Sequence, residues 1–288
     1  MIFTKSYEIQ SGPEPITWSE YVDKSSTEFH NLLDQDCEEN IYQDFFERNP
    51  AFIPGALEIV GHSGHYPYMG CLITQPEIGN LFRRKPDFLW LAQDSLSFTP
   101  VFIEIEKPSK KSFTSQGILS AEFNQALGQI KEWQGIFKTP ANVMAFNNLF
   151  KLPAYITEKS FEPQYLLIYG RRSEYEDDDR LRILRNESQG SDLRIISYDR
   201  LKPEYDCSNA VTCEVKQGSY VVKHISPTYK YSPSGSEDLA KYHGFREKID
   251  DMEHTSDERK EFLKSRYDYW VEYGKHGNKG IIYSSDCE

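Results

Sequence analysis

Two short apolar runs separated by a polar turn form the clearest pattern in the chain. They are residues 87–92 (DFLWLA) and 100–106 (PVFIEIE), and the connection contains QDSLS. Runs of this length, rich in aromatic and β-branched residues, are typical of strands, and a short polar connection favours a hairpin. The pattern predicts two adjacent antiparallel strands, with Asp87 at the start of the first and Glu104 and Glu106 inside the second.

Helical spacing appears in three other segments. Apolar residues recur every three or four positions over residues 117–137, at Leu119, Phe123, Leu127, Ile130 and Phe137. This spacing places them on one face of an amphipathic helix. A second helix is expected over 26–46, ended by the Asn-Pro pair at 49–50, because a residue before proline disfavours helical backbone angles. A third helix is expected over 177–185.

Further apolar stretches favour buried strands at 142–146, 165–169 and 193–198, and residues 1–9 favour a short terminal strand. The glycine- and histidine-rich stretch 61–67 is expected to be a loop. Strands that alternate with helices predict an α/β fold, with a mixed central sheet flanked by helices.

The character of the chain changes after about residue 205. The stretch CEVKQGSYVVKHI predicts a hairpin that turns at Gly218, and SPSGSEDLAK predicts a linker into a charged helical part. We therefore divide the chain into an N-terminal strand and helix extension (1–39), an α/β domain (40–202) and a hairpin-plus-helical C-terminal region (203–288).

Aromatic residues punctuate the charged C-terminal helical part, at Phe262, Tyr267, Tyr269, Trp270 and Tyr273. One interpretation is a helical hairpin packed on the core, and another is a contact with a second subunit. Exposed tyrosine and tryptophan side chains favour protein interfaces. We therefore expect a homo-oligomer.

Composition limits the class of protein. The 288 residues are 38% hydrophobic and 14% aromatic, so most of the chain is expected to fold. The formal net charge of −12 argues against a generally basic nucleic-acid coat protein. Two local basic clusters, residues 82–85 and 107–111, flank the acidic stretch and remain compatible with phosphate contacts or with solvated loops.

Cysteine usage and hydropathy indicate the compartment. The five cysteines are widely spaced and contain no CxxC pair, so neither a zinc ribbon nor a disulfide framework is indicated. No apolar run approaches 18 residues, and the N-terminus lacks a signal-peptide core. We expect a soluble cytoplasmic protein with reduced thiols and no membrane association.

The second predicted strand carries unusual charges. Side chains alternate between faces along a strand, so Glu104 and Glu106 share one face with Phe102, and Lys107 lies on the other. With Asp87 on the neighbouring strand, three carboxylates converge and raise one another's pKa. A divalent cation removes this repulsion, and oxygen ligands suit Mg²⁺ or Mn²⁺. The alternative is that both glutamates lie on a solvated sheet face.

The order of these features resembles the PD-(D/E)XK nuclease superfamily. Pro86-Asp87 stands as its first signature, Glu104-Ile105-Glu106 as its acid–any–lysine signature, and Gln129-x-x-x-Trp133 as a helix motif. More closely, the chain resembles the nuclease domain of Shedu antiphage defence proteins over about residues 40–202. The pieces that carry this likeness are FFERNPAFI, RRKPDFLWL, VFIEIEKP, FNQALGQIKEW, YLLIYGRR and LRIISYDRL.

The resemblance implies a restriction-endonuclease-like fold and a Mg²⁺-dependent DNA endonuclease in antiphage defence, with DNA as partner and a homo-oligomeric assembly. It implies that Asp87 and Glu104 bind the metal together with a backbone carbonyl at residue 105. Glu47, on the preceding helix, would be a ligand for a second metal or a solvated helix residue. Gln129 would orient a ligand, touch a phosphate or simply lie on the helix surface.

One departure from the superfamily pattern concerns the lysine. Glu106 occupies its usual position, and Lys107 faces away unless a bulge re-aims it. We favour Glu106 as base or second metal ligand, whereas Lys107, Lys110 or Lys111 could instead supply the positive charge. The loss of the lysine keeps open a catalytically silent nucleic-acid-binding or assembly module, and a restriction or repair nuclease is a further alternative.

Three other motifs have simpler interpretations. His62-x-x-His65 lacks a second pair of ligands for zinc, so these histidines are expected in a loop near DNA. Gly170-Arg171-Arg172 either grips a phosphate or caps the sheet. The acidic run 174–180 is expected to be a solvated helix start, where acids complement the helix dipole. A GxxxxGK[ST] loop is absent from the sequence, which argues against ATP hydrolysis.

Overall fold

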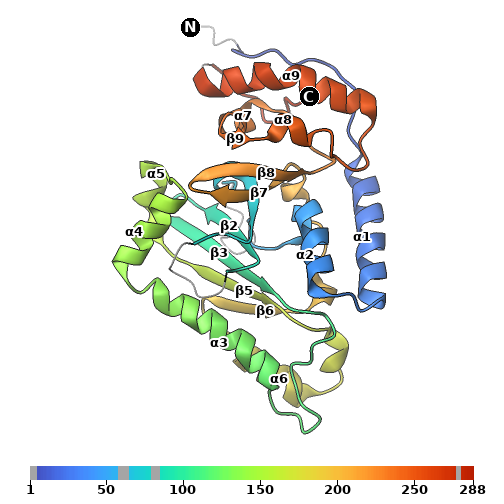
Figure 1. Cartoon of the computed structure of the whole chain (residues 1–288), viewed down its shortest axis with the longest axis vertical. Helices are drawn as coiled ribbons and strands as arrows, with labels where there is room; N and C mark the ends of the chain where they lie inside the picture. The colour runs from blue at the N-terminus through green and yellow to red at the C-terminus, as the bar shows by residue number, and fades with distance from the viewer. Residues whose placement is uncertain (1–4, 58–64, 79–84, 277–279) are drawn as a thin grey trace.

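A single mixed sheet organises the protein (Figure 1). The computed structural model describes residues 5–57, 65–78, 85–276 and 280–288. The described strands are ordered β6-β5-β3-β2-β1-β7-β8-β9, and β4 pairs with β3. Their bounds are β1 Cys71–Thr74, β2 Phe88–Gln93, β3 Ser97–Ile105, β4 Ser160–Phe161, β5 Gln164–Ile168, β6 Leu193–Ile196, β7 Val211–Lys216, β8 Ser219–Ile225 and β9 Tyr242–His243.

The predicted hairpin is confirmed as β2 and β3, which pair antiparallel with Phe88 opposite Ile103. Its turn is closed by the Asp94 carboxylate, which accepts hydrogen bonds from the Leu96 and Ser97 backbone N–H groups at 2.7 and 2.6 Å. β5 pairs parallel with β3, and β6 pairs parallel with β5. Antiparallel and parallel pairs occur together, so the mixed α/β sheet predicted from the sequence is confirmed.

Helices flank this sheet. Their bounds are α1 Trp18–Asp34, α2 Glu39–Arg48, α3 Ala121–Ile136, α4 Pro140–Leu149, α5 Ala154–Thr157, α6 Asp179–Glu187, α7 Ser236–Leu239, α8 Phe245–Lys248 and α9 Asp257–His276. The helix predicted over 117–137 is confirmed as α3, which begins after Ser120, whose hydroxyl accepts the Phe123 N–H at 3.0 Å. None of the described helices is long and apolar enough to cross a membrane.

Three predicted elements are wrong. The helix expected over 26–46 is two helices, α1 and α2, separated at Asp36, whose φ of 48° is left-handed. The strand expected at 142–146 belongs to α4, which has Pro140 at its first position and Phe146 as its buried side chain. Residues 5–9 form no strand, and the rest of the predicted terminal strand lies outside the described residues.

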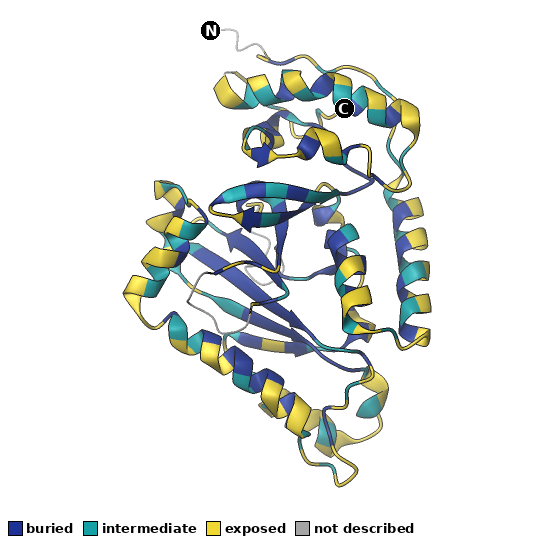
Figure 2. Cartoon of the chain, in the orientation of Figure 1, coloured by how far each residue is buried: buried dark blue, intermediate teal, exposed yellow. Residues whose placement is uncertain are grey.

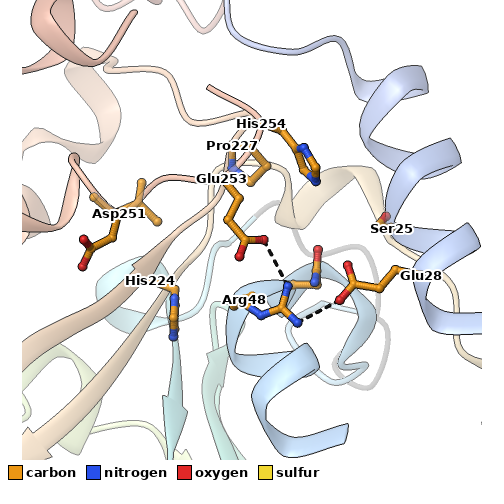
Figure 3. Close-up of a pocket in the computed structure, with 10 residues that line it drawn as sticks. Ser25, Glu28, Arg48, His224, Pro227, Asp251, Glu253 and His254 are labelled. Carbon is orange, nitrogen blue, oxygen red and sulfur yellow. Dashed lines mark hydrogen bonds and ion pairs between the residues drawn. The ribbon is translucent and has the colours of Figure 1, made fainter. Parts of the chain in front are cut away.

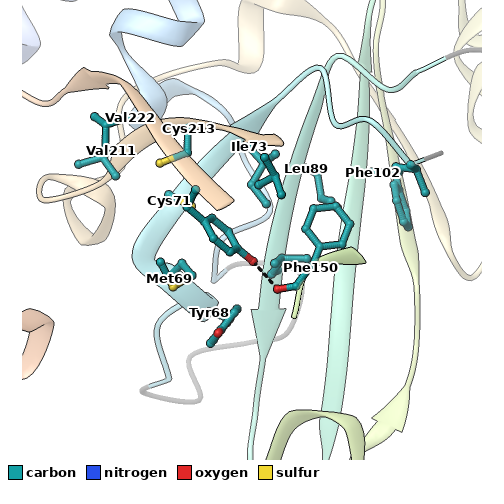
Figure 4. Packing of buried hydrophobic residues seen from close by; sticks show 14 of the residues in the cluster. Tyr68, Met69, Cys71, Ile73, Leu89, Phe102, Phe150, Val211, Cys213 and Val222 are labelled. Carbon is teal, nitrogen blue, oxygen red and sulfur yellow. Dashed lines mark hydrogen bonds between the residues drawn. The ribbon is translucent and has the colours of Figure 1, made fainter. Parts of the chain in front are cut away.

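The two faces of the sheet carry separate apolar cores, and the central strands β1, β2 and β3 between them are almost wholly buried (Figure 2). α1 and α2 cover the face that contains Val101 and Ile103. α3 and α4 cover the face that contains Phe102 and Leu89, and Figure 4 shows part of this second core around Phe150. Both faces are therefore covered, which rules out the open solvated sheet face considered from the sequence.

The C-terminal hairpin is confirmed as β7 and β8, which turn at Gln217 and Gly218 with φ of 52° and 75°. β7 also pairs parallel with β1, so one continuous sheet crosses the boundary predicted at residue 202. The expectation of exposed aromatics in the C-terminal helices is wrong, because Trp270 is buried and the others are partly buried: Phe262, Tyr267, Tyr269 and Tyr273. The aromatic pattern of α9 therefore supports packing on this chain.

An arginine at the end of α2 contacts residues of α1 and of the segment before α9 (Figure 3). The Arg48 guanidinium lies 2.8 Å from a Glu28 carboxylate oxygen on α1 and 3.0 Å from one of Glu253, which precedes α9. These contacts connect the N-terminal helices to the C-terminal region. The partners are partly exposed, so each contact contributes little stability alone.

Candidate functional site

Two carboxylates meet at the end of the β2–β3 hairpin. Extending the register by one residue beyond the Phe88–Ile103 pair places Asp87 opposite Glu104. Opposed residues of antiparallel strands point to the same side of the sheet, with Cβ atoms roughly 5 Å apart. The Asp87 Oδ2 atom accepts the Ile105 backbone N–H at 2.8 Å, which fixes the carboxylate at the strand end.

Glu104 is buried and incompletely satisfied. Its exposed fraction is 9%, and its side chain faces α3, where the Gln129 Nε2 atom donates to Oε1 at 2.7 Å. The second oxygen, Oε2, is buried and accepts no hydrogen bond from any described residue. Burial, followed by repulsion from Asp87 and Glu106, raises the pKa of Glu104 well above its usual range. A buried carboxylate oxygen without a donor is unfavourable unless something occupies its coordination sphere.

The Asp87 carboxyl is perturbed in the same direction. Burial raises its pKa to about 7, the Ile105 N–H opposes the shift, and repulsion from Glu39 and Glu106 adds to it. These two strongly shifted carboxyls lie next to each other at the edge of the core. Perturbed groups of this kind are enriched at functional sites.

Glu106 is paired with a lysine of this chain. Lys110 forms an ion pair with the Glu106 Oε2 atom, and the Glu106 N–H donates to the Ile168 carbonyl at 3.0 Å. Burial lowers the pKa of Lys110, but the contact with Glu106 outweighs it and raises that pKa above its ordinary value. Lys107 instead lies 2.9 Å from Glu38, beside the α2 layer. Of the lysines considered from the sequence, Lys110 is the one that the structure places at the carboxylates.

A further acid that sequence reasoning missed joins this group. Glu39, the first residue of α2, is half-buried, and burial followed by repulsion from Glu106 raises its pKa. It also contributes to the raised pKa values of Asp87 and Glu104. An acid in the first helical turn normally complements the helix dipole, so the sequence offered no distinctive signal for it.

Glu47 lies in a different network. Its carboxylate accepts hydrogen bonds from Lys223 at 2.8 Å, Thr74 at 2.5 Å and Gln43 at 3.2 Å. Burial raises its pKa, but the hydrogen bonds, first that of Lys223, outweigh it and lower the pKa below the usual value. Glu47 thus joins α2 to β8 and is already paired with a cation.

The remaining motifs have structural partners. His65 lies 3.2 Å from the Ser95 hydroxyl, and His62 falls outside the described residues. Arg171 pairs with Asp199 at 2.8 Å. The acidic run is not simply a solvated helix start, because Glu174 precedes α6 and accepts two backbone N–H groups.

The donor set at the hairpin end is small. Within the described ranges, no group of three or more His, Cys, Asp or Glu side chains is arranged to hold a metal ion. The donors that fit a hard cation are the two carboxylates of Asp87 and Glu104, with the unsatisfied Oε2 atom between sheet and α3.

One family of known proteins matches the part of the chain that contains this site. The family described as "Shedu protein SduA, C-terminal" matches residues 36–201, which is more than half of the chain. This span contains the hairpin, α3 and the loop that carries Lys110. No curated protein matches the chain. The chain therefore belongs to the Shedu family, and this membership points to a role in antiphage defence.

Proposed function

We propose that this protein is a divalent-cation-dependent DNA endonuclease of restriction-endonuclease-like fold that acts in antiphage defence. The observation that carries the proposal is the pair formed by the half-buried Asp87 and the buried Glu104. Each has a raised pKa, and Glu104 has an oxygen without a donor. A cation would neutralise both groups, whereas a purely structural pair would be expected to have a basic partner of its own.

Asp87 and Glu104 would hold the Mg²⁺ or Mn²⁺ ion, with the Ile105 carbonyl and solvent as further ligands. The ion would lower the pKa of a bound water and neutralise charge on the phosphate. Gln129 holds the Glu104 carboxylate through its Nε2–H, and the Ile105 N–H holds Asp87. Both carboxylates are thus oriented by fixed donors, which reduces the rearrangement needed on binding.

Lys110 would replace the lysine that the sequence motif lacks. Its ammonium group is held by Glu106, whose charge raises the pKa values of Asp87 and Glu104. An ammonium in this position stabilises negative charge that develops on a phosphate during cleavage. We therefore assign the charge-stabilising role to Lys110 and a supporting role to Glu106.

A catalytically silent nucleic-acid-binding module is the second candidate. It is favoured by the small donor set, since no described group of three acidic or metal-binding side chains is preassembled. It is also favoured by the Lys110 contact, which occupies Glu106. The two candidates differ in whether the Asp87–Glu104 pair supports cleavage.

The test uses the purified full chain with supercoiled plasmid and with linear duplex DNA. Cleavage is measured with Mg²⁺, with Mn²⁺ and with EDTA, for wild type, Asp87→Asn and the control Asp177→Asn. Asp177 is exposed and its side chain makes no hydrogen bond or ion pair among the described residues. The same Asp→Asn change at this position therefore controls for the loss of one carboxylate charge away from the site. Titration calorimetry with Mn²⁺ adds a readout that does not depend on activity.

The endonuclease proposal expects metal-dependent nicking by wild type and Asp177→Asn, and neither cleavage nor Mn²⁺ binding by Asp87→Asn. DNA binding without cleavage in any metal would contradict it and support the silent module. A homo-oligomer remains part of the proposal, and light scattering that shows a monomer with and without DNA would contradict that part.

A further inference from the structure

The loop that carries Lys110 is held by a buried arginine. Arg185 of α6 is 4% exposed, and its Nη1 atom donates to the Ser112 hydroxyl. Its Nη2 atom donates to the Tyr169 carbonyl at 2.7 Å and to the Ile196 carbonyl at 3.4 Å. One guanidinium therefore connects the ends of β5 and β6 to residue 112, two positions beyond Lys110.

This arginine makes no ion pair with any carboxylate in the described part of the chain. Its guanidinium instead lies 4.9 Å from the Tyr175 ring centre and 5.6 Å from that of Phe123. Burying a charged group without a directly paired counter-charge is unfavourable. A neutral side chain would suit a purely structural core position better. The contacts that the Arg185 guanidinium makes with Ser112 and Tyr169 therefore suggest a role for its charge.

Glu174 binds the same loop through its carboxylate. Its two carboxylate oxygens accept the Ser112 and Phe113 backbone N–H groups, each at 2.9 Å. The Ser120 hydroxyl donates to the Lys111 carbonyl at 2.7 Å. Residues 111–113 are thus fixed by three side chains from outside the loop.

Gly170, which follows β5, lies close to the backbone of this loop. Its φ is +64°, and a Cβ atom at this position would lie 2.9 Å from the Lys110 carbonyl oxygen. A side chain there would push the backbone of Lys110 away from β5. The close approach of the two backbones leaves Lys110 little freedom to move toward the sheet.

We propose that Arg185 and Glu174 are positioning residues that clamp loop 107–113, so that the Lys110 ammonium stays at the carboxylate site. Neither residue touches the carboxylates directly, and both act through Ser112 and Phe113, two and three positions beyond Lys110. This inference rests on the proposed nuclease function and adds two residues that position its lysine. Within the Gly170-Arg171-Arg172 segment, only Gly170 among these three residues is placed against Lys110, while Arg171 and Arg172 contact Asp199.

The test compares Arg185→Met, Arg185→Lys and Glu174→Gln with the control Arg182→Met. Arg182 lies on the same helix, is exposed and pairs with Asp179. For each full-length variant, kcat and KM for plasmid nicking and the Tm are measured. Hydrogen exchange of residues 107–113 is measured alongside.

The clamp predicts that Arg185→Met lowers kcat by about tenfold or more with little change in KM, since the loop loses its position while DNA contacts remain. Arg185→Lys is expected to recover part of this loss. Exchange should rise in residues 107–113 but not in β5, whereas Arg182→Met should match wild type. If Arg185→Met does not fold, Arg185→Lys and Glu174→Gln give the same test with a smaller loss.

A double-mutant cycle separates positioning from general destabilisation. If the clamp acts through Lys110, then adding Arg185→Met to Lys110→Ala causes no further loss of kcat. An equal loss in both backgrounds, or a lowered Tm with unchanged kcat, would overturn the clamp while leaving the nuclease proposal intact. Absence of cleavage by wild type would overturn the nuclease proposal and the clamp with it.

Discussion

Two buried glutamates in this chain have opposite electrostatic surroundings. Glu104 is 9% exposed and Glu47 is 7% exposed, so burial alone does not distinguish them. Glu47 receives hydrogen bonds from Lys223 and two neutral donors, and its pKa is lowered. Glu104 receives one from Gln129 and lies beside other acids, and its pKa is raised.

This difference separates a structural carboxylate from a candidate ligand. A buried acid with its own lysine is complete and links α2 to β8. A buried acid beside Asp87 and Glu106, with one oxygen unsatisfied, is unfavourable by itself, and a bound cation would relieve this cost. The family resemblance implied that Glu104 is a metal ligand and that Glu47 is either a ligand for a second metal or a solvated helix residue. The surroundings of the two side chains favour different roles for them under the proposed function.

The largest expected effect separates Glu104→Gln from its matched control Glu47→Gln. Glu104→Gln keeps an acceptor for Gln129 but removes a ligand charge, so cleavage should fall by roughly a hundredfold or more, about 3 kcal/mol. Glu47→Gln should leave kcat near wild type. Plasmid nicking under single-turnover conditions compares them, and equal losses in both variants would remove the distinction between the two glutamates.

The next effect concerns the lysine. Lys110→Ala should lower kcat by roughly tenfold to a hundredfold, because the ammonium group that pairs with Glu106 is lost. Lys107→Ala should be mild, since its ammonium pairs with Glu38 near α2. The same nicking assay ranks them. The reverse ranking would mean that Lys107 turns inward during catalysis and that the assignment of Lys110 is wrong.

A smaller effect is expected on stability. Glu47→Gln leaves Lys223 without its closest partner, so urea unfolding should show a loss of about 1–2 kcal/mol, limited because Lys223 is partly exposed. Glu104→Gln should unfold at the same or higher urea concentration in EDTA, because it relieves repulsion. A Glu104→Gln variant that is clearly less stable than wild type would show that its charge has a structural partner.

The smallest effect is on pH dependence, measured in EDTA. The folded-state pKa of Asp87 is raised to about 7, above the unfolded value of roughly 3.9. Its contribution to stability is therefore full below about pH 4 and is lost as pH rises through 7. The full shift corresponds to about 4 kcal/mol, but Asp87 is only half-buried and solvent screens the repulsion, so wild type should lose on the order of 1 kcal/mol relative to Asp87→Asn between pH 4 and 8. Parallel stability curves for the two proteins would contradict the shifted pKa.

Local sequence patterns correctly predicted the elements in which the apolar pattern and the flanking turn residues indicate the same structure. Short apolar runs around a polar turn predicted β2 and β3, helical spacing predicted α3, and Gly218 predicted the turn between β7 and β8. Each of these elements has an apolar pattern that fits its own packing. Local signals failed at α4, where Asn142–Phe146 is apolar enough for a strand but follows a helix-starting Pro140.

The parts of the site that sequence missed depend on contacts between distant segments. Glu39 meets Glu106 only because the chain breaks at Asp36 and begins α2 there. Lys110 could be proposed but not chosen, because its position is set by Glu174 and Arg185, more than sixty residues later. Strand periodicity did place Asp87 and Glu104 together, since antiparallel register follows from the hairpin itself.

Metal binding at Asp87 and Glu104 is tested most directly by a crystal structure of the full chain soaked in Mn²⁺, with anomalous scattering used to locate the ion. We expect a peak with oxygens of both Asp87 and Glu104 within about 2.0–2.6 Å, including the unsatisfied Oε2 atom. We expect no peak at Glu47. The absence of a peak at the hairpin end after a soak in excess Mn²⁺, or a peak at Glu47 instead, would contradict metal binding by Asp87 and Glu104.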